Sequence, residues 1–144
     1  MKLLFISPSP LIRTGLGKVV YHLTKGLVER GYEVHVANNQ YGGQPIVIDG
    51  IIHHPLLGGF DHLPIILDEV NPDVVVAYYP NWFPPFTEIS NLCASKDLKL
   101  LWYVTLEFTE LTLEFLTSLV GANLVATPSL YATKILRRHH IPAT

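Results

Sequence analysis

The sequence contains little cysteine, little charge and no basic cluster. Cys93 is the only cysteine among 144 residues, so an internal disulfide is excluded, and its apolar surroundings favour a core thiol in a reducing compartment. Charged residues make up only 15% of the chain against 49% hydrophobic residues, which argues against disorder. The formal net charge is −2, and no run of Lys or Arg suggests a nucleic-acid partner.

Long hydrophobic runs are also missing. No apolar stretch approaches the length of a membrane-spanning helix. The segment Met1–Ile6 begins like a signal peptide, but Ser7-Pro8-Ser9-Pro10 interrupts it, so its apolar part is too short for that role. We therefore expect a cytoplasmic protein. A peripheral position on the inner face of the membrane is compatible with this sequence but is not indicated by it.

Metal and hydrolase motifs are absent as well. The seven histidines include the adjacent pairs His53-His54 and His139-His140, but neighbours on a strand or a helix point in different directions and chelate poorly. No HExxH motif, cysteine cluster or Gly-x-Ser-x-Gly elbow occurs. We expect no bound metal.

What the sequence does contain is a regular alternation of strand and helix signals. Continuous apolar runs such as Leu3-Leu4-Phe5-Ile6 are typical of parallel strands that are buried on both faces. Asp49-Gly50 predicts a hairpin turn, and Gly31 is a suitable residue to end the first helix. The predicted strands are Lys2–Ser7, Glu33–Ala37, Ile46–Ile48, Ile51–His53, Asp73–Tyr79, Leu98–Val104 and Asn123–Thr127. The predicted helices are Lys18–Arg30, Asp61–Asn71, one opened by Pro84-Pro85, Glu110–Val120, and one capped by Ser129.

This alternation predicts a single α/β domain over residues 1–144, with a doubly wound, mostly parallel, Rossmann-like sheet and helices on both faces. The first helix should bury a stripe formed by Leu16, Val20, Leu23 and Leu27. Ligands of such sheets bind outside the carboxyl ends of the strands. The candidate site therefore comprises five loops: Pro8–Gly17, Asn38–Gly43, Pro80–Pro84, Thr105–Thr109 and Pro128-Ser129.

The first of these loops carries Gly15 and Gly17 before a helix. Glycines there let a phosphate approach backbone N–H groups at the positive helix end, although a tight turn without a ligand needs glycine too. Arg13 and Lys18 could neutralise a phosphate, or could be solvated surface charges. A dinucleotide site is disfavoured, because Val20 stands at the third glycine position and Asn38-Asn39 replace the acid that would hold a ribose.

The later loops carry a carboxylate and aromatic side chains. Glu107 follows Thr105 at the end of an apolar strand, where it could accept sugar hydroxyls or act as a base. Its alternative role is a charge at the start of a helix beginning near Thr109. Trp82 and Phe83 could form an apolar sugar platform, or could pack within their proline-rich loop.

Three segments together resemble the N-terminal domain of GT-B fold glycosyltransferases, in particular the retaining family 4 group. Thr14–Val36 is similar to the opening glycine loop, helix and "RGHEV"-like turn of that group. Asn71–Val76 resembles its "xPDVV" strand entry, and Ala122–Ser129 resembles its "A-D-x-V-x-x-x-S" segment. The helix that ends at Ile141-Pro142 precedes the interdomain linker of the family. The likeness extends over the whole chain.

The resemblance implies an acceptor-binding domain of an enzyme that transfers a sugar from a nucleotide-sugar to a hydroxyl of a sugar or lipid-linked acceptor. The donor-binding domain, with its basic pair and E-x7-E motif, is not in this sequence, so the chain alone should be catalytically incomplete. No cofactor is implied besides the donor substrate. Glu107 stands where many members have a histidine, and it is the candidate catalytic residue. The candidate binding residues are Arg13, Thr14, Gly15, Gly17, Lys18, Asn38, Asn81, Trp82, Thr105 and Ser129.

Two other functions remain open at this stage. The chain could be a non-catalytic acceptor-binding subunit that pairs with a separate donor-binding chain. It could also be an unrelated small α/β nucleotide-binding protein, which would bind its ligand without any partner.

Overall fold

A computed structural model describes residues 1–81 and 85–144. Strands and helices alternate along these residues in an α/β fold with a seven-stranded, mostly parallel sheet, as the sequence predicts. The strands are β1 (Lys2–Ile6), β2 (Glu33–Asn38), β3 (Ile46–Ile48), β4 (Ile51–Pro55), β5 (Val74–Pro80), β6 (Lys99–Thr105) and β7 (Leu124–Ala126). The helices are α1 (Gly15–Val28), η1 (Gly59–His62), α2 (Leu63–Val70), α3 (Phe86–Ser95), α4 (Leu113–Val120) and α5 (Leu130–Arg138).

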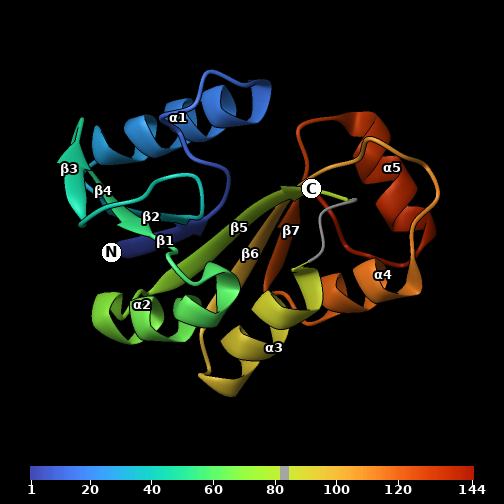
Figure 1. Cartoon of the computed structure of the whole chain (residues 1–144). Coiled ribbons are helices and arrows are strands. Elements are labelled where there is room, and N and C mark those ends of the chain that lie inside the picture. Colours follow the sequence, from blue (N-terminus) through green and yellow to red (C-terminus); the bar gives the residue numbers. More distant parts are fainter. Residues whose placement is uncertain (82–84) are drawn as a thin grey trace. The chain divides into compact units, whose positions relative to one another are not determined.

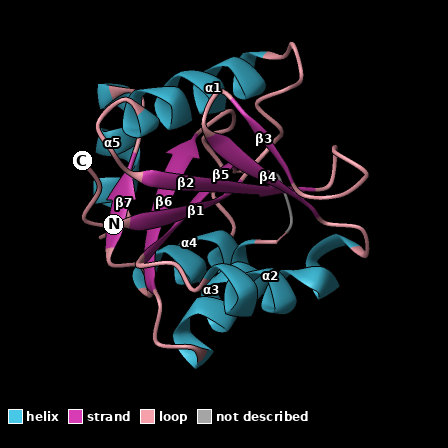
Figure 2. Ribbon diagram, turned by 90° about the vertical axis from the view of Figure 1, so that its left-hand side faces the viewer, coloured by secondary structure: helices cyan, strands magenta, loops and turns pink. Residues whose placement is uncertain are grey.

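The chain forms two compact units, Met1–Val75 and Val76–Thr144. In the first unit the strand order is β3-β4-β2-β1, where β4, β2 and β1 are parallel and β3 runs antiparallel at the edge. Helices α1 and α2 lie on opposite faces of these strands (Figure 2). Both faces of β1 are therefore covered, which explains why Leu3 to Ile6 form an unbroken buried apolar run.

The hairpin between β3 and β4 has the turn that its sequence predicts. Asp49 and Gly50 both have positive φ, 53° and 79°, as the tight turns that suit twisted hairpins require. Gly50 also lies against α1, since a Cβ at this position would lie 2.8 Å from Val28 Cγ1. Gly31, with φ 85°, follows α1 in the left-handed conformation, which confirms its predicted position beyond the helix end.

The buried face of α1 differs from the predicted stripe. The helix begins at Gly15 rather than Lys18, and its buried residues are Gly17, Val20 and Thr24. Leu23 is 37% exposed, so the predicted stripe is wrong at this position. Gly17 packs against the carbonyl oxygens of Ile12 and Ser9 in the preceding loop. The buried Thr24 hydroxyl donates to the Val20 carbonyl oxygen at 2.7 Å within the helix. The hydrophobic pattern predicted burial of the leucines, because such a pattern does not reveal small residues that are buried by close packing.

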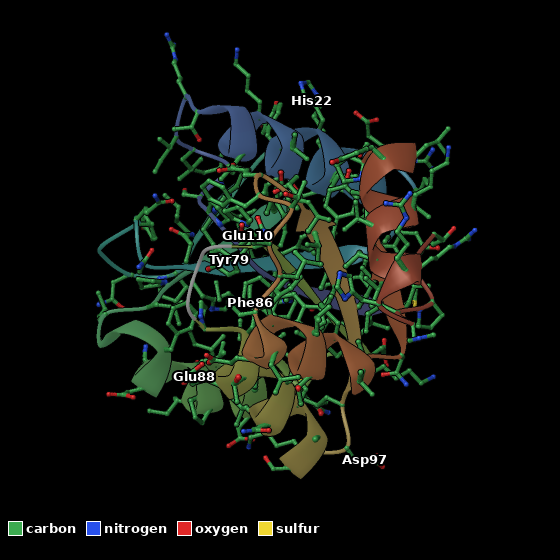
Figure 3. The ribbon with its side chains drawn as sticks, turned by 90° about the vertical axis from the view of Figure 1, so that its right-hand side faces the viewer. His22, Tyr79, Phe86, Glu88, Asp97 and Glu110 are labelled. Carbon is green, nitrogen blue, oxygen red and sulfur yellow. The ribbon has the colours of Figure 1, made fainter. Side chains whose placement is uncertain are left out.

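In the second unit β5, β6 and β7 are neighbours in that order, and β6 and β7 are parallel. Helices α3 and α4 pack side by side on one face, and α5 covers the other (Figure 1). The core is aromatic: the centroid of the Phe86 ring lies 4.6 Å from the ring centroid of Trp102 and 4.8 Å from that of Phe115. Phe86 points inward from α3, whereas Glu88 of the same helix points outward (Figure 3).

Within the described part of the chain, no helix has both the length and the apolar character needed to cross a membrane.

Candidate functional site

Asn81 connects the ends of two strands in the second unit. Its backbone N–H donates to the Thr105 carbonyl oxygen at 3.1 Å, directly after β5 and at the end of β6. Its side-chain oxygen accepts the Glu107 backbone N–H at 2.9 Å, and its side-chain nitrogen donates to the Phe108 carbonyl oxygen at 3.1 Å. The structure thus brings together three of the predicted site residues, namely Asn81, Thr105 and Glu107.

A pocket of about 490 Å³ opens beside this connection. Its walls come from Asn81 and from the loop between β6 and α4: Phe108, Thr109, Glu110 and Thr112. Phe108 is 59% exposed, so its ring is accessible from the pocket. Glu110 lies in the same loop (Figure 3). An amide, hydroxyls, a carboxylate and an aromatic face together suit a neutral ligand that has both hydroxyl groups and apolar C–H surface.

Glu107 is exposed at this edge, and its predicted alternative role is wrong. Helix α4 begins at Leu113 rather than near Thr109, and Thr112 caps it by accepting the Phe115 backbone N–H at 3.2 Å. The acid in its first turn is Glu114. Glu107 is therefore too far from the helix end to act as its terminal charge.

Tyr78 lies beneath this edge and was missed by the sequence analysis, which treated it as one more residue of an apolar strand. The centroids of the Tyr78 and Tyr103 rings lie 5.0 Å apart. Burial, together with the neighbouring Tyr103 and the Glu107 carboxylate, raises the pKa of Tyr78 to about 12, although a hydrogen bond with Thr105 acts in the opposite direction. The Tyr78 hydroxyl therefore keeps its proton at neutral pH and can act as a hydrogen-bond donor near Glu107.

In the first unit the two glycines of the predicted phosphate loop have different roles. Both belong to the first turn of α1, whose N-terminus is capped by Thr14: its hydroxyl oxygen accepts the Gly17 backbone N–H at 3.0 Å. A Cβ on Gly17 would overlap the Ile12 carbonyl oxygen and lie 2.9 Å from that of Ser9. Gly17 is therefore required by packing of the loop itself. Gly15 is exposed, and a Cβ there would meet nothing within 4 Å.

Asn38 is fully buried at the end of β2, so it does not offer its side chain to a ligand at the surface. Its side-chain oxygen accepts the Gln40 backbone N–H at 3.1 Å, and the Gln40 side-chain oxygen accepts the Ser9 backbone N–H at 2.8 Å. Asn38 thereby holds the turn that ties this loop to the segment before α1. Arg13 and Lys18 are exposed on the same unit.

Ser129, another predicted residue of the second unit, is not among the described residues that line the Asn81 pocket. Ser129 caps α5, where its hydroxyl oxygen accepts the Ala132 backbone N–H at 3.1 Å, as the sequence predicts. Trp82 and Phe83 lie outside the described residues. Sequence reasoning did not identify Phe108, Glu110 or Thr112, although a large aromatic residue between polar residues after a strand was an available signal.

The cysteine and histidine residues give no sign of a metal centre in the described part of the chain. No three His, Cys, Asp or Glu side chains there are grouped so that they could hold an ion. Cys93 is buried, and burial raises the pKa of its thiol to about 11, so the thiol is protonated and unreactive at neutral pH.

Comparison with models of protein families finds none that matches this chain. Comparison with curated protein sequences finds no significant match either.

Proposed function

We propose that this chain is the acceptor-binding half of a retaining glycosyltransferase that transfers a sugar from a nucleotide-sugar to an acceptor hydroxyl. The observation that supports this most is the pocket beside Asn81, at the ends of β5 and β6. Loops at the carboxyl ends of parallel strands are where α/β proteins bind their ligands. The type of reaction is inferred from the resemblance of the sequence to GT-B enzymes.

The chemistry of the pocket suits an acceptor sugar. Its Asn, Thr and Glu side chains provide both donors and acceptors for ring hydroxyls, and the exposed Phe108 ring can pack on the apolar face of a sugar. None of its described lining residues is Lys or Arg, which argues against an anionic ligand. In the proposed reaction Glu107 contacts the reacting sugar as a hydrogen-bond acceptor or a base.

The first unit would contribute to holding the donor diphosphate. The Gly17 N–H is already donated to Thr14, which leaves the N–H groups of Gly15 and Leu16 at the positive end of α1. Exposed Arg13 and Lys18 add positive charge on either side. Stabilisation of the leaving diphosphate by such fixed positive groups would supply much of the catalysis.

The proposal is tested by the kinetics of Glu107→Gln in the assembly that contains both the acceptor-binding and donor-binding halves. We expect kcat to fall by roughly one to three decades, as for loss of a charged or general-base contact, with an unchanged thermal melt. Glu88→Gln on the outer face of α3 is the matched control and should keep kcat. An unchanged kcat in Glu107→Gln would remove Glu107 from the mechanism.

The chain by itself is expected to give no useful turnover with any nucleotide-sugar, because the donor-binding motifs of the family are missing from its sequence. The measurement is product formation by the purified chain with a panel of nucleotide-sugars and acceptors. Robust turnover by the chain alone would contradict the half-enzyme proposal. Acceptor binding without turnover in any assembly would favour the non-catalytic subunit.

A further inference from the structure

The first unit contains a buried chain of hydrogen bonds that the proposed transfer reaction does not use. Glu33 Oε1 lies 2.9 Å from His35 Nε2, and His35 Nδ1 lies 2.8 Å from His54 Nε2. The two imidazole rings stack at 5.1 Å between centroids, with 20° between their planes. Both histidines are buried, whereas Glu33 is exposed. The chain therefore runs from the surface inward to His54.

Strand register explains how residues far apart in the sequence form this chain. In the parallel pair β2–β4, His35 is level with Ile52 and Ala37 is level with His54. Residues two apart on a strand share a face, so His35 and His54 are diagonal neighbours on the same face of the sheet. His53 points to the opposite face. Residues of α2 line the same pocket as His54, which identifies this face as the one that α2 covers.

The carboxylate at the outer end determines the proton positions along the chain. A hydrogen bond from His35, supported by the charge of Lys2, lowers the pKa of Glu33, so Glu33 is ionised at neutral pH and can only accept. When both rings are neutral, His35 must carry its proton on Nε2 and accept at Nδ1. His54 must then carry its proton on Nε2, which leaves a lone pair on His54 Nδ1.

This lone pair is available to a ligand. His54 lines a pocket of about 230 Å³, and among the described residues its Nδ1 atom has no hydrogen-bond partner. Burial, together with the nearby charges of His35 and His53, lowers the pKa of His54 to about 4, so the ring is neutral at pH 7. His54 Nδ1 is therefore a hydrogen-bond acceptor at the pocket wall.

The rest of the wall is also rich in acceptors. His62 Nδ1 lies 3.4 Å from the Pro55 carbonyl oxygen, which can only accept, so in the neutral ring the lone pair of His62 is on Nε2. Glu69 of α2 adds a carboxylate, and no Lys or Arg is among the lining residues. Leu57 and Ile66 supply apolar surface. Such a wall favours a ligand with a positive charge, several N–H donors and a short apolar body.

We propose that this pocket binds the ammonium group of a small organic amine, with His54 Nδ1 and Glu69 as its acceptors and with Leu57 and Ile66 against its apolar part. An ammonium group has three donors and no acceptor, which matches the lone pair of His54 and the carboxylate of Glu69, and the Gln44 side-chain amide can also accept through its oxygen. Glu33 and His35 act as positioning residues, because they fix which nitrogen of His54 carries the proton. This site is independent of the proposed glycosyltransferase function.

The first test uses ¹⁵N NMR of the histidine rings in the full chain at pH 7.5. His54 should be protonated at Nε2 and unprotonated at Nδ1. Titration with n-butylammonium should shift the His54 Nδ1 signal saturably, with a Kd in the millimolar range that is reasonable for so few ligand atoms. Butyrate, which has a similar body and the opposite charge, should cause no saturable shift. The proposal is overturned if His54 is protonated at Nδ1, if butylammonium does not bind, or if butyrate binds equally well.

The second test separates the site from general attraction of cations to an acidic surface. Glu69→Gln preserves shape and should weaken butylammonium binding several-fold, because a charged acceptor is replaced by a neutral one. Asp68→Asn removes the same charge from the adjacent α2 residue, which does not line the pocket, and should leave Kd unchanged. Equal weakening by both variants would overturn the site. In Glu33→Gln the new amide can donate to His35 as well as accept from it, so the proton of His54 should no longer be fixed on Nε2. A purely structural role for Glu33 would leave the His54 tautomer unchanged.

Discussion

Among the five loops that the sequence nominated for function, those of the first unit differ from the loop after β6 in what their polar groups do. In the first unit the Thr14 hydroxyl oxygen, the Gly17 N–H and the Asn38 side-chain oxygen are engaged in holding the loop and the start of α1, whereas the buried Asn38 Nδ2 atom has no hydrogen-bond partner among the described residues. In the second unit Asn81 fixes the backbone of Glu107 and Phe108, whose side chains stay exposed beside a pocket. A loop built in the second way is held through its backbone and presents the exposed Phe108 ring to a ligand. The same polar residue types therefore indicate either loop packing or a ligand site, and only their contacts distinguish the two.

The largest effect that would sharpen this comparison is expected at Gly17. Gly17→Ala places a Cβ against the carbonyl oxygens of Ile12 and Ser9, so we expect a loss of about 3 kcal/mol or more in the free energy of unfolding. Gly15→Ala has open space and should be neutral or stabilise the helix by up to about 1 kcal/mol. Urea unfolding of the two variants measures this. Equal stability losses would contradict the distinction between them.

Acid should also destabilise the first unit, because this unit buries two neutral histidines. Burial, the largest cause for both residues, lowers the pKa of His53 and His54, the latter to about 4. A pKa below the unfolded value of about 6.5 means that the unfolded chain takes up protons first as the pH falls. Stability is therefore complete above about pH 6.5 and is lost progressively toward pH 4, by up to about 3 kcal/mol for His54.

Urea unfolding at several pH values between 7 and 4 checks this dependence. His53→Phe provides the internal comparison, since no hydrogen-bond partner for either ring nitrogen of His53 is found among the described residues. This variant should unfold with a shallower pH dependence than the wild-type chain. A pH dependence that is identical in His53→Phe would show that His53 does not contribute.

A smaller effect is expected at Asn81. Asn81→Ala removes the two side-chain hydrogen bonds to the backbone of Glu107 and Phe108, which should cost about 1–2 kcal/mol. Asn91→Ala on the exposed face of α3 is the control and should change stability by less than about 0.5 kcal/mol. The measurement is urea unfolding together with backbone amide exchange of residues 105–109. If the loop exchanges no faster in Asn81→Ala, the side chain does not hold it.

Much of the fold could be predicted from the sequence because its signals are local. The apolar run of β1, the Asp49-Gly50 turn and the Ser129 cap each depend on neighbouring residues. The buried face of α1 could not be predicted in this way, because Gly17 and Thr24 pack by being small rather than by being apolar. The start of α4 was also placed too early, which gave Glu107 an alternative role that the structure removes.

The candidate site could be predicted only in part, for a different reason. Asn81, Thr105 and Glu107 were nominated because they follow strands, and the structure connects them. Phe108 and Glu110 were missed, because the path of the loop between β6 and α4 determines which of its side chains reach the pocket. The pairing of His35 with His54 depends on the register of β2 and β4, which no single segment of sequence specifies.

The central claim is that the pocket beside Asn81 binds a sugar. Its most direct test is a ¹⁵N NMR titration of the full chain with a panel of methyl hexopyranosides, following the side-chain amide of Asn81 and the backbone amides of Glu107 and Phe108. We predict that at least one sugar shifts all three signals saturably and that Asn81→Ala abolishes its binding. If no sugar in the panel shifts these signals, or if the same sugar binds Asn81→Ala unchanged, the pocket is not an acceptor site.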